Sequence, residues 1–177
     1  MAAAEPPQEG ERDRTLEAGP RLDEPLPLWG VLDNVRSAFN VGSIFRTAEA
    51  ARMSGLELGG ITPYPPNEQI DRTALGTAHR VPHRHHVRTI DAVEALRGRG
   101  IEIWAVELDP RAISLRSAPT PGPVALIFGH EVLGVSEEVR RRADRIVELP
   151  LYGRKNSLNV AVTFGIVVFD LLRRWGH

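Results

Sequence analysis

The chain has 177 residues, a formal net charge of −1 and no cysteine. This length suits one domain with a substantial core, and the missing cysteines exclude disulfides and thiolate chemistry. The longest apolar run, residues 158–172, is too short for a membrane span and contains polar residues. The first residues lack the basic-then-apolar layout of a signal peptide, so we expect a cytoplasmic protein.

Charge is distributed unevenly along the chain. Residues 1–28 hold seven acids and three arginines, a balance of −4, which leaves 19 bases and 16 acids, or +3, in residues 29–177. The first stretch is rich in proline, glutamate and glycine, so we predict a disordered acidic extension over 1–28 and one folded domain over 29–177. The mildly basic domain permits a nucleic-acid partner without demanding one.

Apolar patterning predicts strands that alternate with helices. The expected strands are residues 29–33, 56–61, 101–108, 123–129 and 145–149, and the expected helices are 40–52, 89–100, a short one after Ser136 and a last one from Leu158. Thr89 and Ser136 are expected to cap their helices. Residues 124–128 are continuously apolar, as in strands covered on both faces. The pattern predicts an α/β domain with a mostly parallel sheet flanked by helices.

The first predicted helix opens within NVRSAFNVGSIFR, residues 34–46. Asn40 and Gly42 would lie at its N-terminus, where free backbone amides attract anions. Arg46 follows one turn after Gly42, whose missing side chain would leave room for a substrate. An ordinary cap with a surface pair between Arg46 and Glu49 is equally consistent with this spacing.

Two further loops follow predicted strands, at the carboxyl edge where parallel sheets bind ligands. In the first, Gly129 and Gly134 permit close approach of a ligand, and Glu131 could bind it or hold a neighbouring loop. A plain strand-to-helix turn, with acids that favour the helix start, explains the same residues.

The second loop, residues 153–159, is polar and runs into the last helix. Asn156 or Ser157 could cap that helix, which is apolar on almost every side and must therefore be buried all round. A well-capped core helix is one explanation, and a subunit interface is the other. The candidates for such an interface are Val160, Phe164, Val167, Val168 and Leu171.

Residues 72–88 form a basic, histidine-rich strip. It contains Arg72, His79, Arg80, His83, Arg84, His85, His86 and Arg88. We expect no metal site, because no acid or cysteine completes one and adjacent histidines of a strand point to opposite faces. The strip fits contacts with RNA phosphates, and a solvated basic face is the alternative. The chain lacks the glycine motifs of nucleotide-binding loops and the nucleophile elbow of hydrolases.

Three segments, in this order, resemble the motifs of the SpoU (TrmH) family of RNA ribose 2′-O-methyltransferases, in the SPOUT superfamily. They are NVRSAFNVGSIFRTAEA, ALIFGHEVLGVSEEV and IVELPLYGRKNSLNVAVTFGIVVFDLLR. The resemblance covers residues 29–174. It implies a C-terminal deep trefoil knot, S-adenosylmethionine as cofactor, and a homodimer with the active site near the subunit interface. General rules disfavour knots, so that expectation rests on the resemblance alone.

The resemblance also implies roles for residues. The implied catalytic residues are Asn40, Arg46, Glu131, Ser157 and Asn159, and the implied cofactor-binding residues are Gly129, Leu149, Pro150, Leu151, Ser157 and Leu158. The candidates for RNA contacts are Arg36, Arg46, Arg72, Arg80 and Arg84.

The implied reaction transfers a methyl group to a ribose 2′-hydroxyl in tRNA or rRNA. A guanidinium pKa above ~12 makes Arg46 a poor base, so we expect this residue to orient the hydroxyl and its phosphate. An inactive knotted RNA-binding module and a small-molecule methyltransferase are the alternatives. The intact polar positions argue against the first, and the basic strip argues against the second.

Overall fold

The computed structural model describes residues 22–177. Residues 1–21, most of the predicted acidic extension, lie outside the described part. The first strand, β1 (Leu26–Asp33), begins three residues before the predicted one, and Leu26 and Leu28 are buried. The domain boundary predicted at residue 29 is therefore too late, because residues 26–28 already belong to the sheet.

A seven-stranded sheet forms the centre of the domain, and every pair of neighbouring strands is parallel. The strand order is β3-β2-β1-β6-β4-β7-β5. The remaining strands are β2 (Met53–Gly59), β3 (His83–His86), β4 (Glu102–Val106), β5 (Ile113–Ser114), β6 (Val124–Gly129) and β7 (Arg145–Glu148). The predicted α/β class with a mostly parallel sheet is confirmed.

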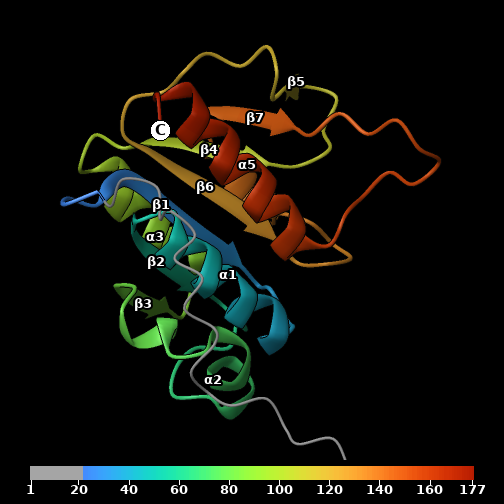
Figure 1. Ribbon diagram of the computed structural model, residues 1–177. Helices are drawn as coiled ribbons and strands as arrows, with labels where there is room; N and C mark the ends of the chain where they lie inside the picture. The colour runs from blue at the N-terminus through green and yellow to red at the C-terminus, as the bar shows by residue number, and fades with distance from the viewer. Residues whose placement is uncertain (1–21) are drawn as a thin grey trace, which may run out of the picture.

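Helices cover both faces of the sheet (Figure 1). One face carries α1 (Ala38–Ala50), α2 (Glu68–Ala74) and α5 (Val160–Arg174), and the other carries α3 (Thr89–Arg97) and α4 (Glu137–Arg140). Successive side chains of β6 alternate between the two cores: Leu126 and Phe128 pack under α1 and α5, whereas Ala125 and Ile127 pack under α3. This double burial explains why the strand is continuously apolar.

Several helix starts differ from the predictions. α1 begins at Ala38 with Ser37 as its cap, and α5 begins at Val160 with Asn159, not Asn156 or Ser157, as its cap. The side chain of Asn159 accepts hydrogen bonds from the first free amides of α5. Thr89 is the first residue of α3 and does not cap it, because its hydroxyl donates to Asp33 instead. Ser136 occupies the cap position of α4, but its side chain makes no capping bond.

Four regular elements have no counterpart among the predictions: α2, the 3-10 helix η1 (Thr77–His79), and the short strands β3 and β5. α2 has only seven residues, too few for a recognisable apolar period. Its N-terminus is fixed by Asn67, whose side chain accepts from two backbone amides. α5, the helix with the longest apolar run, has 15 residues, and no helix within residues 22–177 is both long and apolar enough to cross a bilayer.

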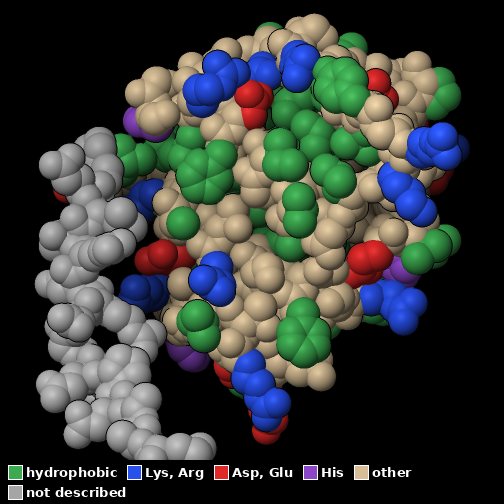
Figure 2. Space-filling model, turned by 45° about the vertical axis from the view of Figure 1, so that its right-hand side comes forward, with side chains coloured by type: hydrophobic (Ala, Val, Ile, Leu, Met, Phe, Trp, Pro, Cys, Tyr) green, Lys and Arg blue, Asp and Glu red, His purple; other side chains and the backbone are tan. Residues whose placement is uncertain are grey.

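Of the two explanations for the apolar α5, a core helix and a subunit interface, the structure supports the core for four of the five candidate residues. Phe164, Val167, Val168 and Leu171 are fully buried in the core of this chain, so they are not available to a partner. The exposed apolar side chains of α5 lie on another stripe of the helix: Val162 (51% exposed), Ile166 (41%) and Phe169 (51%). Figure 2 shows hydrophobic side chains gathered on this side of the molecule.

Candidate active site

A cavity of about 450 Å³ opens at the carboxyl edge of the sheet. Its walls come from the ends of β4, β6 and β7 and from the start of α5, as expected for a ligand site in a parallel sheet. Five of the six predicted cofactor-binding residues line it, namely Gly129, Leu149, Leu151, Ser157 and Leu158. Pro150 does not, so the structure gives it no place in the cavity wall.

The acidic and basic side chains that line the cavity are all acidic, apart from His130. Glu107, Glu131 and Glu148 line the cavity, and no lysine or arginine does. A wall of this kind disfavours phosphate ligands and favours a ligand whose net charge is positive. The cavity therefore suits a cationic cofactor better than a nucleotide.

Three of the predicted catalytic residues form one hydrogen-bonded network beside the cavity. The side-chain amide of Asn40 donates to Glu131 at 3.0 Å, and the side-chain amide of Asn159 donates to Asn40 at 3.0 Å. These residues come from α1, from the loop after β6 and from the start of α5, so the contact links segments 91 and 119 residues apart in sequence. The sequence identified all three residues, and the structure brings them together.

Glu131 is held as a carboxylate by this network. Its two oxygens also accept the backbone amides of Arg36 and Ser37, at 3.0 and 3.1 Å. Burial disfavours the charge, but these amides and the side chain of Asn40 outweigh that effect and hold the pKa of Glu131 below its ordinary value. Glu131 therefore braces the N-terminal end of α1 at neutral pH.

The Glu131 loop, residues 129–136, is closed tightly on itself. His130 and Gly134 exchange two backbone hydrogen bonds, at 3.0 and 2.8 Å. A side chain on Gly129 would place its Cβ 2.1 Å from the carbonyl carbon of Gly134, so this approach requires glycine. The predicted close approach at Gly129 is real, but the partner is the loop's own backbone.

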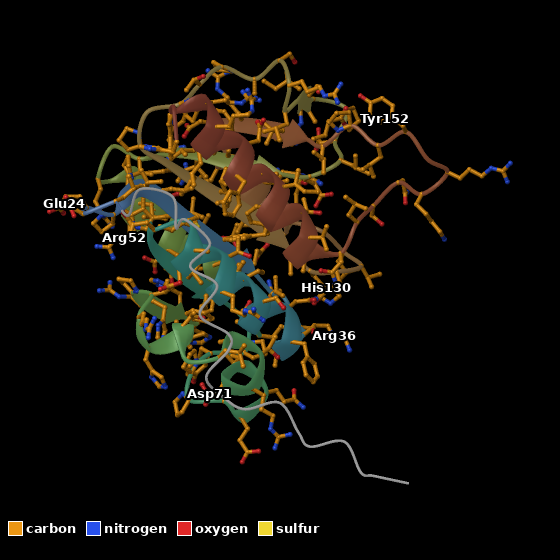
Figure 3. All side chains as sticks on the ribbon, in the orientation of Figure 1. Glu24, Arg36, Arg52, Asp71, His130 and Tyr152 are labelled. Atoms are coloured by element: carbon orange, nitrogen blue, oxygen red, sulfur yellow. The ribbon has the colours of Figure 1, made fainter. Side chains whose placement is uncertain are left out.

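The loop predicted to bind the cofactor, residues 149–159 and called the cofactor loop, projects away from the body of the domain (Figure 1). None of residues 150–158 forms a hydrogen bond with another residue of the described chain. Tyr152 is exposed, and the guanidinium of Arg116 lies 5.5 Å from its ring centroid. In Figure 3, His130 and Arg36 mark the side of the Glu131 loop, and Tyr152 lies on the cofactor loop. The two walls of the cavity are thus built differently.

Arg46 does not line the cavity. It is exposed on α1, six residues after Asn40, which places it about 9 Å further along the helix and on another side. The prediction that Gly42 leaves room for a substrate is wrong, because Gly42 packs against α2, with Ile70 O 2.9 Å from a Cβ placed there. The alternative explanation, a surface pair between Arg46 and Glu49, is not seen either, and Glu49 instead pairs with Arg80 at 3.6 Å.

The basic strip is divided by the fold. The imidazole of His83 meets the ring of Phe45 of α1 edge-on, so the alternation along β3 turns Arg84 to the opposite face of the sheet. Of the other candidates for RNA contacts, Arg72 pairs with Glu68 and Arg80 pairs with Glu49. Arg36 is exposed beside the Glu131 loop. The strip is therefore not one continuous basic surface.

Sequence reasoning missed several residues of the site. Glu107 and Glu148 line the cavity from the ends of β4 and β7, and Thr163 lines it from α5. Their position at the carboxyl ends of predicted strands, or in the first turns of the last helix, was the available signal. Across residues 22–177, no group of three or more His, Cys, Asp or Glu side chains is arranged to hold a metal ion.

The comparisons with known proteins agree with this geometry. A family profile described as the SpoU rRNA Methylase family matches residues 27–169. A tRNA (guanosine(18)-2'-O)-methyltransferase of Thermus thermophilus is 31% identical over 168 residues, which cover 92% of this chain and 86% of the relative. The enzyme of the same name from Escherichia coli is 28% identical, over 81% of this chain and 62% of the relative.

Solved structures share the fold. The crystal structure of an AdoMet-bound rRNA methyltransferase from Sinorhizobium meliloti superposes with a TM-score of 0.78 and 32% identity, over 88% of this chain and 58% of that chain. A tRNA-modifying enzyme described as TrmH/SpoU from A. aeolicus superposes with the same TM-score and 25% identity, over 86% of this chain and 77% of that chain. The chain thus spans less than two thirds of the Sinorhizobium and Escherichia relatives.

Proposed function

This chain belongs to the SpoU rRNA Methylase family, and on that premise we propose that it is an S-adenosylmethionine-dependent RNA 2′-O-methyltransferase. The observation that carries the proposal is the acidic cavity beside the network of Asn40, Glu131 and Asn159. No observation favours an inactive RNA-binding module, since each of the five implied catalytic positions holds the expected side chain.

The cavity fits the cofactor by its chemistry. S-adenosylmethionine supplies an electrophilic methyl group on a sulfonium ion, and it also carries an ammonium group. Glu107, Glu131 and Glu148 would favour these positive charges, and Leu149, Leu151 and Leu158 would contact the apolar parts of the cofactor. Gly129 and Ser157 would complete the binding site as predicted.

Asn40, beside the cavity, and Arg46, outside its lining, are the residues that would hold the RNA. Arg46 would orient the ribose hydroxyl and its phosphate and stabilise negative charge that develops on the attacking oxygen. Its exposure outside the cavity lining suits a residue that contacts RNA and not the cofactor. Asn40 would hold the ribose while Glu131 and Asn159 fix its side chain. An Arg46→Lys enzyme with near-full activity would contradict the role of the planar guanidinium.

We also propose a homodimer and a C-terminal trefoil knot. The exposed apolar stripe of α5, Val162, Ile166 and Phe169, supports the dimer, because large exposed apolar patches mark interaction sites. Light scattering should therefore give the mass of a dimer for the wild type and of a monomer for Phe169→Glu.

The position of β7 between β4 and β5 supports the knot, as does family membership. A cytoplasmic location belongs to the same proposal, because relatives act on tRNA.

One assay tests the function directly. The protein is incubated with methyl-labelled S-adenosylmethionine and separate pools of tRNA and rRNA, and the modified nucleotide is mapped in each pool. Transfer to a ribose 2′-oxygen in either pool is expected. Transfer to neither pool, by a protein that binds the cofactor, would contradict the proposed activity.

A further inference from the structure

The Glu131 loop uses its backbone amides internally, one after another. Nδ1 of His130 accepts the amides of Val132 and Leu133, at 3.0 and 3.2 Å. The amide of Gly134 donates to the carbonyl of His130 at 2.8 Å. Because an amide can only donate, the imidazole must carry no proton on Nδ1 in this arrangement.

The next two amides are held by carboxylates from the two strands that flank β6. Oε2 of Glu107, directly after β4, accepts the amide of Val135 at 2.7 Å. Oδ2 of Asp33, the last residue of β1, accepts the amide of Ser136 at 2.7 Å. Five consecutive amides, residues 132–136, therefore have an acceptor. This leaves the loop with carbonyl oxygens and carboxylates to offer a ligand, and none of these five amides free.

Asp33 is a buried carboxylate whose surroundings are built for it. It is 1% exposed and does not line the cavity. Its other oxygen accepts the hydroxyl of Thr89 at 2.6 Å and the side-chain amide of Asn34 at 2.9 Å. Gly59 permits this arrangement, because a Cβ there would lie 2.2 Å from the Thr89 hydroxyl. A carboxylate buried this deeply is costly unless its hydrogen bonds are complete, so its placement is specific.

We propose that Asp33 and Glu107 are positioning residues that clamp the Glu131 loop between them, an inference that rests on the proposed function. The clamp fixes Glu131, which in turn fixes Asn40 on the RNA side of the site. Asp33 lies outside the cavity and reaches the cofactor only through the Glu131 loop, so we expect its loss to lower turnover more than cofactor affinity. Glu107 lines the cavity, so it acts on both.

The clamp can be opened by a substitution at its last amide. Ser136→Pro deletes the amide hydrogen that Asp33 accepts and puts the ring Cδ against Oδ2 of Asp33, so this contact is forced apart, while the φ of −58° at Ser136 suits proline. Ser136→Ala is the matched control, because it keeps the amide and loses a hydroxyl that makes no capping bond. Asp144→Asn is a second control, since Asp144 also accepts a strand amide, that of Ile103 at 2.8 Å, but does not line the cavity.

Three quantities are measured for each variant: hydrogen exchange of residues 130–136, the Kd for S-adenosylmethionine without RNA, and turnover with RNA at saturating cofactor. Ser136→Pro should speed the exchange and lower turnover about tenfold or more, the effect of one lost bond to a charged group, with the Kd changed less than about threefold. Glu107→Gln should lower turnover and also raise the Kd about tenfold. Both controls should stay within about twofold of the wild type.

Two results would overturn the clamp. One is unchanged loop exchange and turnover in Ser136→Pro, and the other is an equal loss of turnover and cofactor affinity in it, which would indicate general damage. If Ser136→Pro does not fold, Asp33→Asn keeps one oxygen for the Ser136 amide and should recover turnover that Asp33→Ala loses. Hydrogen exchange needs no RNA, so it decides the clamp even if the wild type methylates no RNA and the proposed function fails.

Discussion

The two loops that enclose the cavity differ in how they are held. The Glu131 loop has an acceptor for each amide from 132 to 136, whereas residues 150–158 of the cofactor loop make no hydrogen bond within the described chain. We therefore expect the first wall to be formed before any ligand binds and the second wall to gain order when the proposed cofactor binds. Such a division would keep the reacting groups in place and leave an entrance for the cofactor.

Alanine substitutions at two glycines, one in each loop, should show the largest difference between the two loops. Gly129→Ala would place a Cβ 2.1–2.3 Å from backbone atoms of Gly134 and Val135, while nothing lies within 4 Å of a Cβ at Gly153. We expect Gly129→Ala to lower the free energy of unfolding by about 1–3 kcal/mol and to abolish cofactor binding. Gly153→Ala should change the free energy of unfolding by less than about 0.5 kcal/mol. Denaturant unfolding measures stability and calorimetry measures cofactor binding. Equal effects at the two glycines would refute the difference between the loops.

Glu131→Gln tests whether the carboxylate of the Glu131 loop is needed to hold the start of α1. The amide of glutamine has one acceptor oxygen, so at least one of the amides of Arg36 and Ser37 loses its partner. Turnover should fall about 100-fold, with a smaller change in the Kd for the cofactor. Glu138→Gln is the control, because Glu138 is an exposed residue paired with Arg88. A Glu131→Gln enzyme within a few-fold of the wild type would show that the brace is dispensable.

Hydrogen exchange with and without S-adenosylmethionine sharpens the comparison further. Ordering of the cofactor loop should slow exchange of residues 150–158 about tenfold, corresponding to about 1.4 kcal/mol. Exchange of residues 129–136 should change less than about twofold, because the amides of 132–136 are already bonded. Equal protection of both loops would mean that the Glu131 loop also gains its order from the cofactor.

The smallest expected effect is the part of the folding stability that Glu131 contributes and that is lost at acid pH. Its pKa is lower in the folded chain than the ordinary value of 4.5, so the unfolded state binds the proton first as the pH falls. The stabilisation is complete above about pH 5 and is lost as the pH falls toward the lowered pKa. The Tm difference between wild type and Glu131→Gln should therefore shrink between about pH 6 and about pH 3. A constant difference would argue against a lowered pKa.

The sequence predicted what local pattern and motif encode. The alternating strands and helices followed from apolar periodicity, and Asn40, Glu131 and Asn159 followed from the motifs; the structure joins these three in one network. Asp33 and Thr89 were not recognised as partners because they lie 56 residues apart and meet only through the strand order. Thr89 looked like a helix cap, since a threonine before an apolar run is typical of one.

Which side of a helix is buried was harder to predict than where the helix lies in the sequence. In α5, an all-round apolar helix gives no sign of which stripe is buried, so Phe164 and Val167 were named as candidates for an interface, whereas both lie in the core. In α1, Gly42 looked like a gap for a ligand, but α2, which was itself not predicted, fills it. Both errors have one cause: burial is decided by segments distant in sequence.

The place of β6 between β1 and β4 has a consequence for how the protein folds. β1 pairs with β2 on one side, β4 pairs with β7 on the other, and the two groups of strands meet only through β6. Before residues 124–129 insert, each half-sheet would expose an unpaired edge, which is a hazard for aggregation. The same insertion brings Gly129 beside Asp33 and joins the parts of the site. Closure of the sheet and assembly of the active site therefore depend on the same contacts between β1 and β6, which are distant in sequence, and contacts of this kind slow folding.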